Sequence, residues 1–360
     1  MTTTLDTSAA TLTTDGFAEK IFDAVRGAAQ VQALYLGDRL GWYRVLSEEG
    51  PLTAAELAHR TGTVERYARE WLEHQTVSGI VAADLNAEPV RFALPRDYAA
   101  VLVDADSTSY LAPMARFFTA TGFHLHDLVQ AYRNGGGVSW EELGTDAREA
   151  QSAINRPMFL RQLTTELLPQ VPDVQKLLED GARVADIGCG EGWSAIALAL
   201  GYPACEIDGF DIDQPSITAA KRNAAVHGVA DRTTFTAADA AALPPAGYDA
   251  VFAFECIHDL PHPVGVLKNM RRIAKPGAPV IVMDERTADA FRPDAGPVEE
   301  LLYGYSILCC LPDGMSHGNS AATGTVMRAS TLDDYARSAG FGGATPLAVE
   351  HDFFRFYRLQ

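Results

Sequence analysis

The stretch VADIGCGEGWSAIALALG, residues 184–201, decides the fold class of this chain. It begins as an apolar run with an acid at Asp186, continues with three glycines at alternate positions, and ends with apolar residues at helical spacing. This order predicts a buried strand, a tight loop and the start of a helix. Glycines at such a junction allow backbone amides and a helix N-terminus to approach a ligand closely.

Segments of the same kind recur through the second half of the chain. Apolar runs without alternation indicate parallel strands that are covered on both faces, and helix-forming segments separate them. We expect these strands within EIDGFDI, TTFTAAD, YDAVFAFECI and APVIVMDE, residues 206–212, 233–239, 248–257 and 278–285. Two further strands, within 345–350 and 353–359, follow each other so closely that they should form an antiparallel hairpin. The sequence therefore predicts an α/β, Rossmann-like sheet with an antiparallel end.

The first half of the chain is predicted to be helical. Residues 17–103 have the outline of a winged helix-turn-helix, preceded by a loose polar tail at 1–16, and the glycine at position 37 should break the first helix. The second helix of this motif carries more acids than bases, which favours a packing or dimerisation module over a DNA-reading one. Residues 104–180 are expected to form a helical bridge and lid, and residues 181–360 the ligand-binding domain.

Composition excludes several classes of function. The 360 residues carry a formal net charge of -18, which repels phosphate backbones, so we expect no nucleic-acid partner. The sequence shows neither a bilayer-spanning apolar run nor a secretion signal, and its five cysteines are odd in number and without CxxC spacing. We therefore expect a cytoplasmic protein that does not bind membranes. No group of histidine, cysteine and acidic residues has metal-ligand spacing, so no metal is expected.

The spacing of the glycines distinguishes between nucleotide ligands. A dinucleotide site uses G-x-G-x-x-G around a pyrophosphate, whereas this loop reads G-x-G-x-G with Asp186 beside it. That carboxylate would repel a pyrophosphate but suits a ligand that carries an ammonium and a sulfonium. At the ends of the next two strands, Asp211 can accept hydrogen bonds from ribose hydroxyls and Asp239 from an adenine amino group.

On these motifs the sequence resembles the class I S-adenosylmethionine-dependent methyltransferases, whose sheet has seven strands and ends in a similar hairpin. The segments NGGGVSW, NRPMF, IHD, LLYGYSILCCLP, AATGTVMR and EHDFFRFYRL resemble an actinobacterial-type subfamily with an N-terminal winged-helix domain. The resemblance implies S-adenosylmethionine as cofactor and S-adenosylhomocysteine as product. The cofactor-binding residues would be Asp186, Gly188, Cys189, Gly190, Gly192, Asp211, Ile212, Asp239, Ala240 and Glu255.

The stretch FECIHDLPHP, residues 254–263, follows the fourth strand, where this family places groups that face the transferred methyl. We predict His258 as a general base, with Glu255 and Asp259 as acidic partners. His258 and Asp259 are neighbours in sequence, so a turn is needed to bring their side chains together. The alternative is a structural histidine bonded to a loop carbonyl.

Candidate acceptor-binding residues lie in the bridge and in the long insertion after the fifth strand. They are His124, Trp193, His258, Glu300 and Tyr303. Aromatic residues in both segments suggest an aromatic or otherwise flat small molecule as methyl acceptor, and the N-terminal module suggests a homodimer. Two alternatives are a catalytically silent cofactor-binding regulator and a methyltransferase that acts on a peptide. The glycine spacing and the terminal hairpin disfavour a nicotinamide-dependent oxidoreductase.

Overall fold

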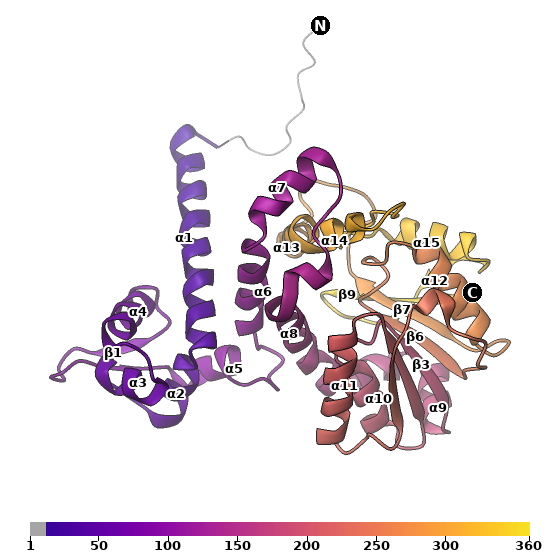
Figure 1. Cartoon of the computed structure of the whole chain (residues 1–360), viewed down its shortest axis with the longest axis horizontal. Coiled ribbons are helices and arrows are strands. Elements are labelled where there is room, and N and C mark those ends of the chain that lie inside the picture. Colours follow the sequence, from indigo (N-terminus) through magenta and orange to yellow (C-terminus); the bar gives the residue numbers. More distant parts are fainter. Residues whose placement is uncertain (1–11) are drawn as a thin grey trace, which may run out of the picture. The chain divides into compact units, whose positions relative to one another are not determined.

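The structure is a computed structural model that describes residues 12–360, and its contacts divide the chain between Thr119 and Ala120 (Figure 1). The division falls inside the segment predicted as a bridge. Most of the predicted tail, residues 1–16, lies outside the described residues. The prediction is wrong at its end, because Thr14 already opens helix α1 (Thr14–Arg39), capped by the side chain of Thr13.

The first unit is a winged helix-turn-helix, as predicted. Trp42, Tyr43 and Leu72 lie in its core, and the wing is an antiparallel pair of short strands. Its remaining elements are α2 (Trp42–Glu49), α3 (Ala54–Thr61), α4 (Glu65–Val77), β1 (Ala82–Asp84), β2 (Arg91–Ala93), η1 (Arg96–Tyr98) and α5 (Ala99–Leu102). Helix α6 (Ala112–Gly122) crosses the division between the units.

Helix α1 does not break at Gly37, contrary to the sequence prediction. It continues to Arg39, and Gly37 lies within it as a buried residue. A Cβ atom at this position would lie 2.4 Å from the Trp71 ring and 2.5 Å from the Tyr43 ring. Glycine is therefore present because two aromatic rings pack against the backbone, and not because the helix ends there.

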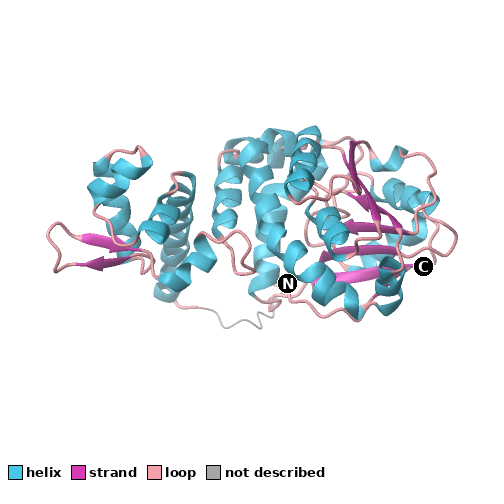
Figure 2. Cartoon of the chain, turned by 90° about the horizontal axis from the view of Figure 1, so that it is seen from below, coloured by secondary structure: helices cyan, strands magenta, loops and turns pink. Residues whose placement is uncertain are grey.

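The second unit contains the predicted seven-stranded sheet, drawn in magenta in Figure 2. Its strand order is β5-β4-β3-β6-β7-β9-β8, parallel from β5 to β7, with β9 antiparallel to both β7 and β8. The strands are β3 (Arg183–Ile187), β4 (Glu206–Asp211), β5 (Thr233–Ala237), β6 (Ala250–Phe254), β7 (Val280–Glu285), β8 (Ala344–Pro346) and β9 (Phe354–Leu359). The chain order changes direction between β3 and β6, which is where such sheets bind ligands.

Helices cover both faces of the sheet, which explains why its parallel strands are apolar throughout. One core cluster joins the sheet to α9 (Pro172–Glu179), α10 (Trp193–Gly201) and α11 (Gln214–Val226). The other joins it to α12 (Pro263–Ile273) and α15 (Ala329–Ser338).

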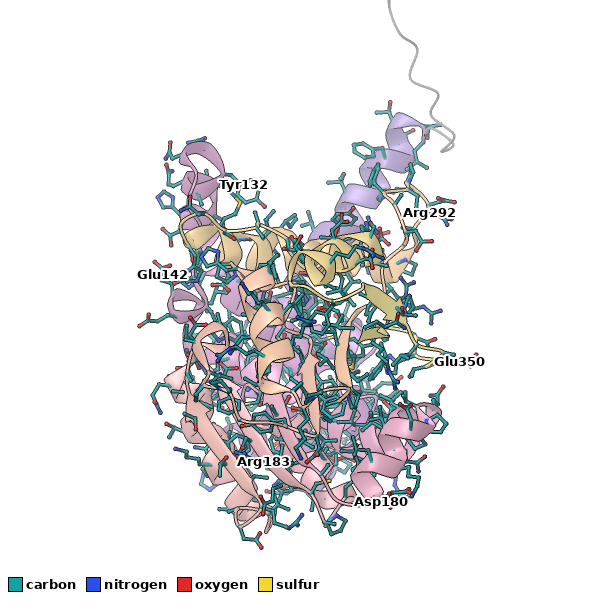
Figure 3. The ribbon with its side chains drawn as sticks, turned by 90° about the vertical axis from the view of Figure 1, so that its right-hand side faces the viewer. Tyr132, Glu142, Asp180, Arg183, Arg292 and Glu350 are labelled. Atoms are coloured by element: carbon teal, nitrogen blue, oxygen red, sulfur yellow. The ribbon has the colours of Figure 1, made fainter. Side chains whose placement is uncertain are left out.

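The remaining helical segments of this unit come from the predicted bridge and the insertion after β7, apart from η4, which follows β5. They are α7 (Leu125–Asn134), α8 (Trp140–Met158), η2 (Phe159–Leu167), η3 (Leu168–Gln170), η4 (Ala240–Ala242), α13 (Pro297–Tyr305), η5 (Ser306–Cys310) and α14 (Leu311–Ser316). Tyr132 and Glu142, from the bridge, lie at the opposite end of the unit from Arg183, where β3 begins (Figure 3). None of the helices from residue 12 onward is long and apolar enough to cross a bilayer.

Candidate active site

The glycine loop between β3 and α10 leaves backbone amides available to a ligand. Gly188 and Gly192 have φ values of 69° and 85°, which disfavour any residue with a side chain. A Cβ at Gly192 would also lie 2.8 Å from the Phe235 ring. The N-cap residue of α10 is Gly192, which has no side chain to cap the helix, so the positive dipole end of α10 lies at the loop.

Asp186 is the buried acid of this site. Its Oδ2 accepts a hydrogen bond of 2.5 Å from Ser194, whereas its Oδ1 has no partner among the described residues. Burial raises the pKa of Asp186 to about 7. A buried carboxylate oxygen without a donor is costly, and an ammonium or a water held by the ligand would satisfy it.

Asp211 connects the second strand to the glycine loop. It accepts 2.8 Å hydrogen bonds from the backbone N–H groups of Gly190 and Asp213, and burial raises its pKa. A carboxylate has about four acceptor sites, so capacity remains for ribose hydroxyls. The side chain of Ile212 is 77% exposed, which leaves an apolar surface beside this acid for a flat ring.

The other predicted cofactor residues have mainly structural contacts in the protein itself. Asp239 is exposed and caps the short turn η4 by accepting a 2.8 Å hydrogen bond from Ala241, next to the half-buried Ala240. The Cys189 thiol is buried, and its backbone N–H donates to the carbonyl of Phe210 at 3.1 Å. The donors and acceptors at Asp186, Asp211 and α10 nevertheless fit S-adenosylmethionine, with its ammonium, ribose and carboxylate.

A turn at Ile257–Asp259 brings His258 and Asp259 together, as the sequence requires. Nε2 of the buried His258 lies 3.2 Å from Asp259 Oδ1. Its Nδ1 lies 2.7 Å from Asp284 Oδ1 and 2.9 Å from Glu285 Oε2, both at the end of β7. Burial alone would lower the pKa of His258, but these three acids raise it well above its ordinary value.

Glu255 lies at the end of β6 in a strained conformation, with a φ of 51°. Its Oε2 is buried without a partner among the described residues, and burial raises its pKa to about 8. The negative charges of His258's neighbours, Asp284 and Asp259, act in the same direction. We call this group of side chains the imidazole cluster. It contains one base, His258, and four acids: Glu255, Asp259, Asp284 and Glu285.

Two groupings in this cluster have the composition of a metal site. They are His258 with Asp259 and Cys310, and His258 with Asp284 and Glu285, each with its ligand atoms within 4.8 Å of one another. In the second grouping Nδ1 is already at direct hydrogen-bond distance from the carboxylate oxygens. The expectation that the chain needs no metal stays a prediction, because sequence spacing could not show either grouping.

The predicted acceptor-binding residues lie apart from one another. His124 lies 3.5 Å from Asp127 in its own helix, and Glu300 is exposed. The Tyr303 hydroxyl accepts a 2.9 Å hydrogen bond from Arg328. Their role in acceptor binding stays a prediction.

Trp193 is the first residue of α10, and its side chain contacts α8. Its Nε1 donates a 2.7 Å hydrogen bond to Ser152, and the Arg156 guanidinium lies 5.0 Å from its ring centre. These contacts support the packing role that is the alternative to acceptor binding.

Sequence reasoning missed Asp284, Glu285, Arg148 and Ser152. The two acids end an apolar strand, which is the same signal that identified Asp186 and Asp211. Arg148 and Ser152 lie on a surface of α8 that gives no sign of its partners in the sequence.

Comparisons with known proteins match both halves of the chain. Residues 178–304 match a methyltransferase domain, and residues 12–104 match an Rv2258c-like winged HTH domain. The mitomycin biosynthesis 6-O-methyltransferase of Streptomyces lavendulae is 28% identical over 316 residues, covering 84% of this chain and 85% of that protein. The 27-O-demethylrifamycin SV methyltransferase of Amycolatopsis mediterranei (strain S699) is 32% identical over 127 residues, which cover 35% of this chain and less than half, 46%, of that protein.

Solved structures share the fold along the whole chain. The mitomycin 7-O-methyltransferase MmcR matches with a TM-score of 0.72 and 21% identity, covering 95% of this chain and 97% of that one. PigF with S-adenosylhomocysteine matches with a TM-score of 0.72 and 19% identity, covering 97% and 100%. The domain matches, the strand order and the glycine loop show that the chain contains an S-adenosylmethionine-dependent methyltransferase domain and an N-terminal Rv2258c-like winged-helix domain.

Proposed function

We propose that this protein transfers a methyl group from S-adenosylmethionine to an oxygen of a small, flat acceptor, with His258 accepting the acceptor's proton. The observation that carries the proposal is the buried imidazole of His258, held between acids at the carboxyl end of the sheet, two residues after Cys256, which packs against Gly188 of the glycine loop. Two of the relatives are named for the methylation of natural products, one in mitomycin biosynthesis and one of a rifamycin. That similarity supports a specialised small molecule over a peptide.

Different residues of the chain would bind the cofactor and accept the proton. Asp186, Asp211 and the amides of α10 would hold the cofactor, whose sulfonium supplies a methyl group and an excellent leaving group. Asp284 accepts a hydrogen bond from Nδ1–H of His258 and so leaves Nε2 as the proton acceptor. Positioning of the acceptor by a closed site supplies much of the rate, and proton removal adds about 10²–10⁴-fold.

Titration calorimetry tests the proposal with S-adenosylmethionine, S-adenosylhomocysteine and NADH. We expect the first two to bind and NADH to give no heat. Asp211→Ala should weaken S-adenosylmethionine binding at least about tenfold, because hydrogen bonds to a charged group contribute about 1.5–3 kcal/mol each. Binding of NADH alone would overturn the proposal, and unchanged affinity in Asp211→Ala would show that the ribose lies elsewhere.

We also propose that the protein is a homodimer formed through the first half of α1. Phe17, Ile21, Phe22 and Val25 are each at least half exposed there, and the buried residues of this helix, Ala33 and Gly37, are in its second half. Large apolar side chains that gather on one helix face are typical of a protein interface.

A further inference from the structure

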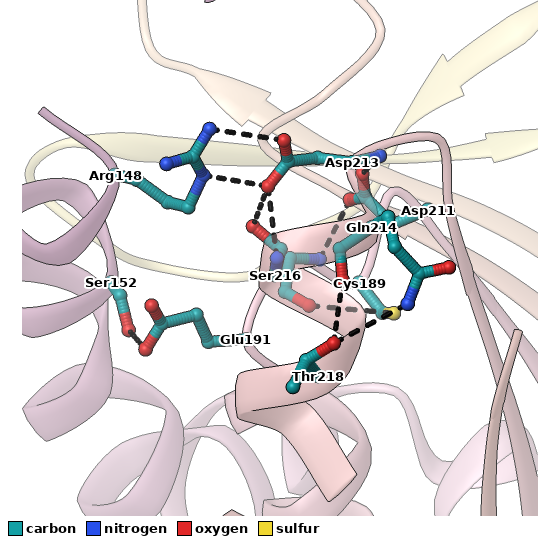
Figure 4. Close-up of polar contacts among 10 residues, drawn as sticks. Arg148, Ser152, Cys189, Glu191, Asp211, Asp213, Gln214, Ser216 and Thr218 are labelled. Atoms are coloured by element: carbon teal, nitrogen blue, oxygen red, sulfur yellow. Dashed lines mark hydrogen bonds and ion pairs between the residues drawn. The ribbon is translucent and has the colours of Figure 1, made fainter. Parts of the chain in front are cut away.

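Helix α8 carries two polar side chains one turn apart, and each bonds to a different loop of the cofactor site (Figure 4). Arg148 reaches Asp213, which follows the ribose acid Asp211 by two residues. Ser152 reaches Glu191, in the middle of the glycine loop. The segment of α8 that carries both begins after Gly144, where the helix changes direction with a φ of 76°.

The contact of Arg148 with Asp213 is a two-pronged ion pair that is largely shielded from solvent. Nε donates to Oδ2 at 2.7 Å and Nη2 to Oδ1 at 3.1 Å, with the side chains 11% and 12% exposed. Asp213 also caps α11, because Oδ2 accepts from the N–H of Ser216 at 2.9 Å and from its hydroxyl at 2.6 Å. Burial would raise the pKa of Asp213, but the donors Arg148 and Ser216 hold it below its usual value.

The contact of Ser152 ties α8 to the glycine loop. Its hydroxyl donates to Glu191 Oε2 at 2.6 Å and accepts from Trp193 Nε1 at 2.7 Å. The backbone carbonyl of Glu191 accepts a 3.1 Å hydrogen bond from Asn223 of α11. The glycine loop is therefore held both from α8 and from α11.

These bonds form a closed circuit that begins and ends on α8. The circuit runs from Arg148 to Asp213, whose N–H donates to Asp211, and Asp211 accepts in turn from Gly190. Gly190 adjoins Glu191, which accepts from Ser152. Asp211, the predicted ribose-binding acid, is thus part of a closed chain of hydrogen bonds. Arg148 and Ser152 connect the two ends of this chain to α8.

We propose that Arg148 and Ser152, here called the α8 latch, position the two cofactor loops and that opening of this latch limits the release of S-adenosylhomocysteine. The inference rests on the proposed cofactor, but not on the acceptor or on the role of His258. A two-pronged guanidinium–carboxylate pair that is largely shielded from solvent is slow to open because both charges must be solvated again. Neither residue needs to touch the cofactor for this effect.

The test is the dissociation rate of radiolabelled S-adenosylhomocysteine, measured by rapid filtration after dilution into excess unlabelled S-adenosylmethionine. Arg148→Met should accelerate dissociation about tenfold or more, because the loop that carries Asp213 and Asp211 can then move away from α8 without separating an ion pair. Ser152→Ala should act in the same direction by a smaller factor. Asp213→Asn keeps a capping residue for α11, so its effect should not add to that of Arg148→Met in the double variant.

Arg116→Met provides the matched control. Arg116 pairs with Asp38 in the first unit, also through two nitrogens, and the two side chains are 15% and 12% exposed. We expect it to lower the melting temperature about as much as Arg148→Met while leaving the dissociation rate within twofold of wild type.

The outcomes separate this inference from the proposed function. A dissociation rate unchanged in Arg148→Met, or raised equally by Arg116→Met, overturns the latch while leaving the cofactor in place. Additive effects of Arg148→Met and Asp213→Asn would also contradict it, because the two residues would then act independently. A wild-type protein that does not bind S-adenosylhomocysteine overturns both the latch and the proposed function.

Discussion

At the scale of single residues, His258 is notable because acids from separate segments engage both of its ring nitrogens. Asp284 and Glu285 face Nδ1 from the end of β7, whereas Asp259 faces Nε2 from the adjacent turn. The His258 side chain is 3% exposed, whereas Asp259, which faces Nε2, is 41% exposed and can pass a proton to solvent. The imidazole is thus held in place on one side and can exchange a proton on the other.

The pH dependence of methyl transfer should report this arrangement. The acids around His258 raise its pKa well above the usual value of about 6.5, because each of them stabilises the protonated imidazole. A base must be deprotonated to act, so kcat should rise as the pH increases through the pKa of His258. Asp284→Asn removes one of the acids and should move this rise to lower pH, which a pH–rate profile in single-turnover mode would show.

His258→Asn tests the same residue without depending on pH. We expect it to lower the single-turnover rate about 10²–10⁴-fold while changing the affinity for S-adenosylmethionine less than twofold. A wild-type rate would assign His258 to a structural role.

The sequence predicts the site residues at the ends of strands better than the site residues on helices. Asp186 and Asp211 are recognisable because the carboxyl ends of parallel strands meet at one edge of the sheet. Arg148 is not recognisable from the sequence, because its partner Asp213 is 65 residues away and no periodicity in α8 indicates the contact. Glu300 is predicted to bind the acceptor because of its position in the insertion. In the structure its neighbour Glu299 is the buried acid, and Glu299 pairs with Arg328 at 2.8 Å.

At the scale of elements, α1 shows how a local rule gives way to packing. Glycine is a poor helix former, so the sequence suggests a break at Gly37. The structure keeps the helix intact because Trp71 and Tyr43, from α4 and α2, occupy the space that a side chain would need. The order of elements was predictable from hydrophobic patterns, whereas this close contact arises only once the helices pack together.

Two glycines of α1 should respond to alanine in opposite directions. Gly37→Ala should lower the free energy of unfolding by about 1–3 kcal/mol, since the new methyl group overlaps two rings. Gly27→Ala, with nothing within 4 Å of the new atom, should instead raise it by up to about 1 kcal/mol through helix propensity. Urea denaturation of both variants checks this, and changes of equal sign would contradict the packing explanation.

At the scale of the molecule, the surface of the first unit favours a protein partner over DNA. The basic residues of α4 are occupied on their own helix, because Arg66 pairs with Glu70 and Arg69 with Glu65. The net charge of -18 adds a general repulsion of nucleic acid. The first unit does, however, expose an apolar face on α1, formed by Phe17, Ile21, Phe22 and Val25.

A second copy of the chain is the partner that we propose for this face, and the interface of a two-fold dimer would place each α1 face against its own copy. The double variant Phe22→Glu/Val25→Glu should therefore convert a dimer into a monomer, because like charges would be brought together in an apolar contact. Light scattering coupled to size-exclusion chromatography measures this change over a range of concentrations.

Val77→Glu is the control, since Val77 is 90% exposed at the end of α4 and lies outside the proposed face. A wild-type protein that is monomeric at every concentration, or a dimer that survives the double variant, would contradict the proposal. If the dimer dissociates and the affinity for S-adenosylmethionine is unchanged, the α1 face serves assembly alone, and the cofactor site of the second unit is complete in one chain.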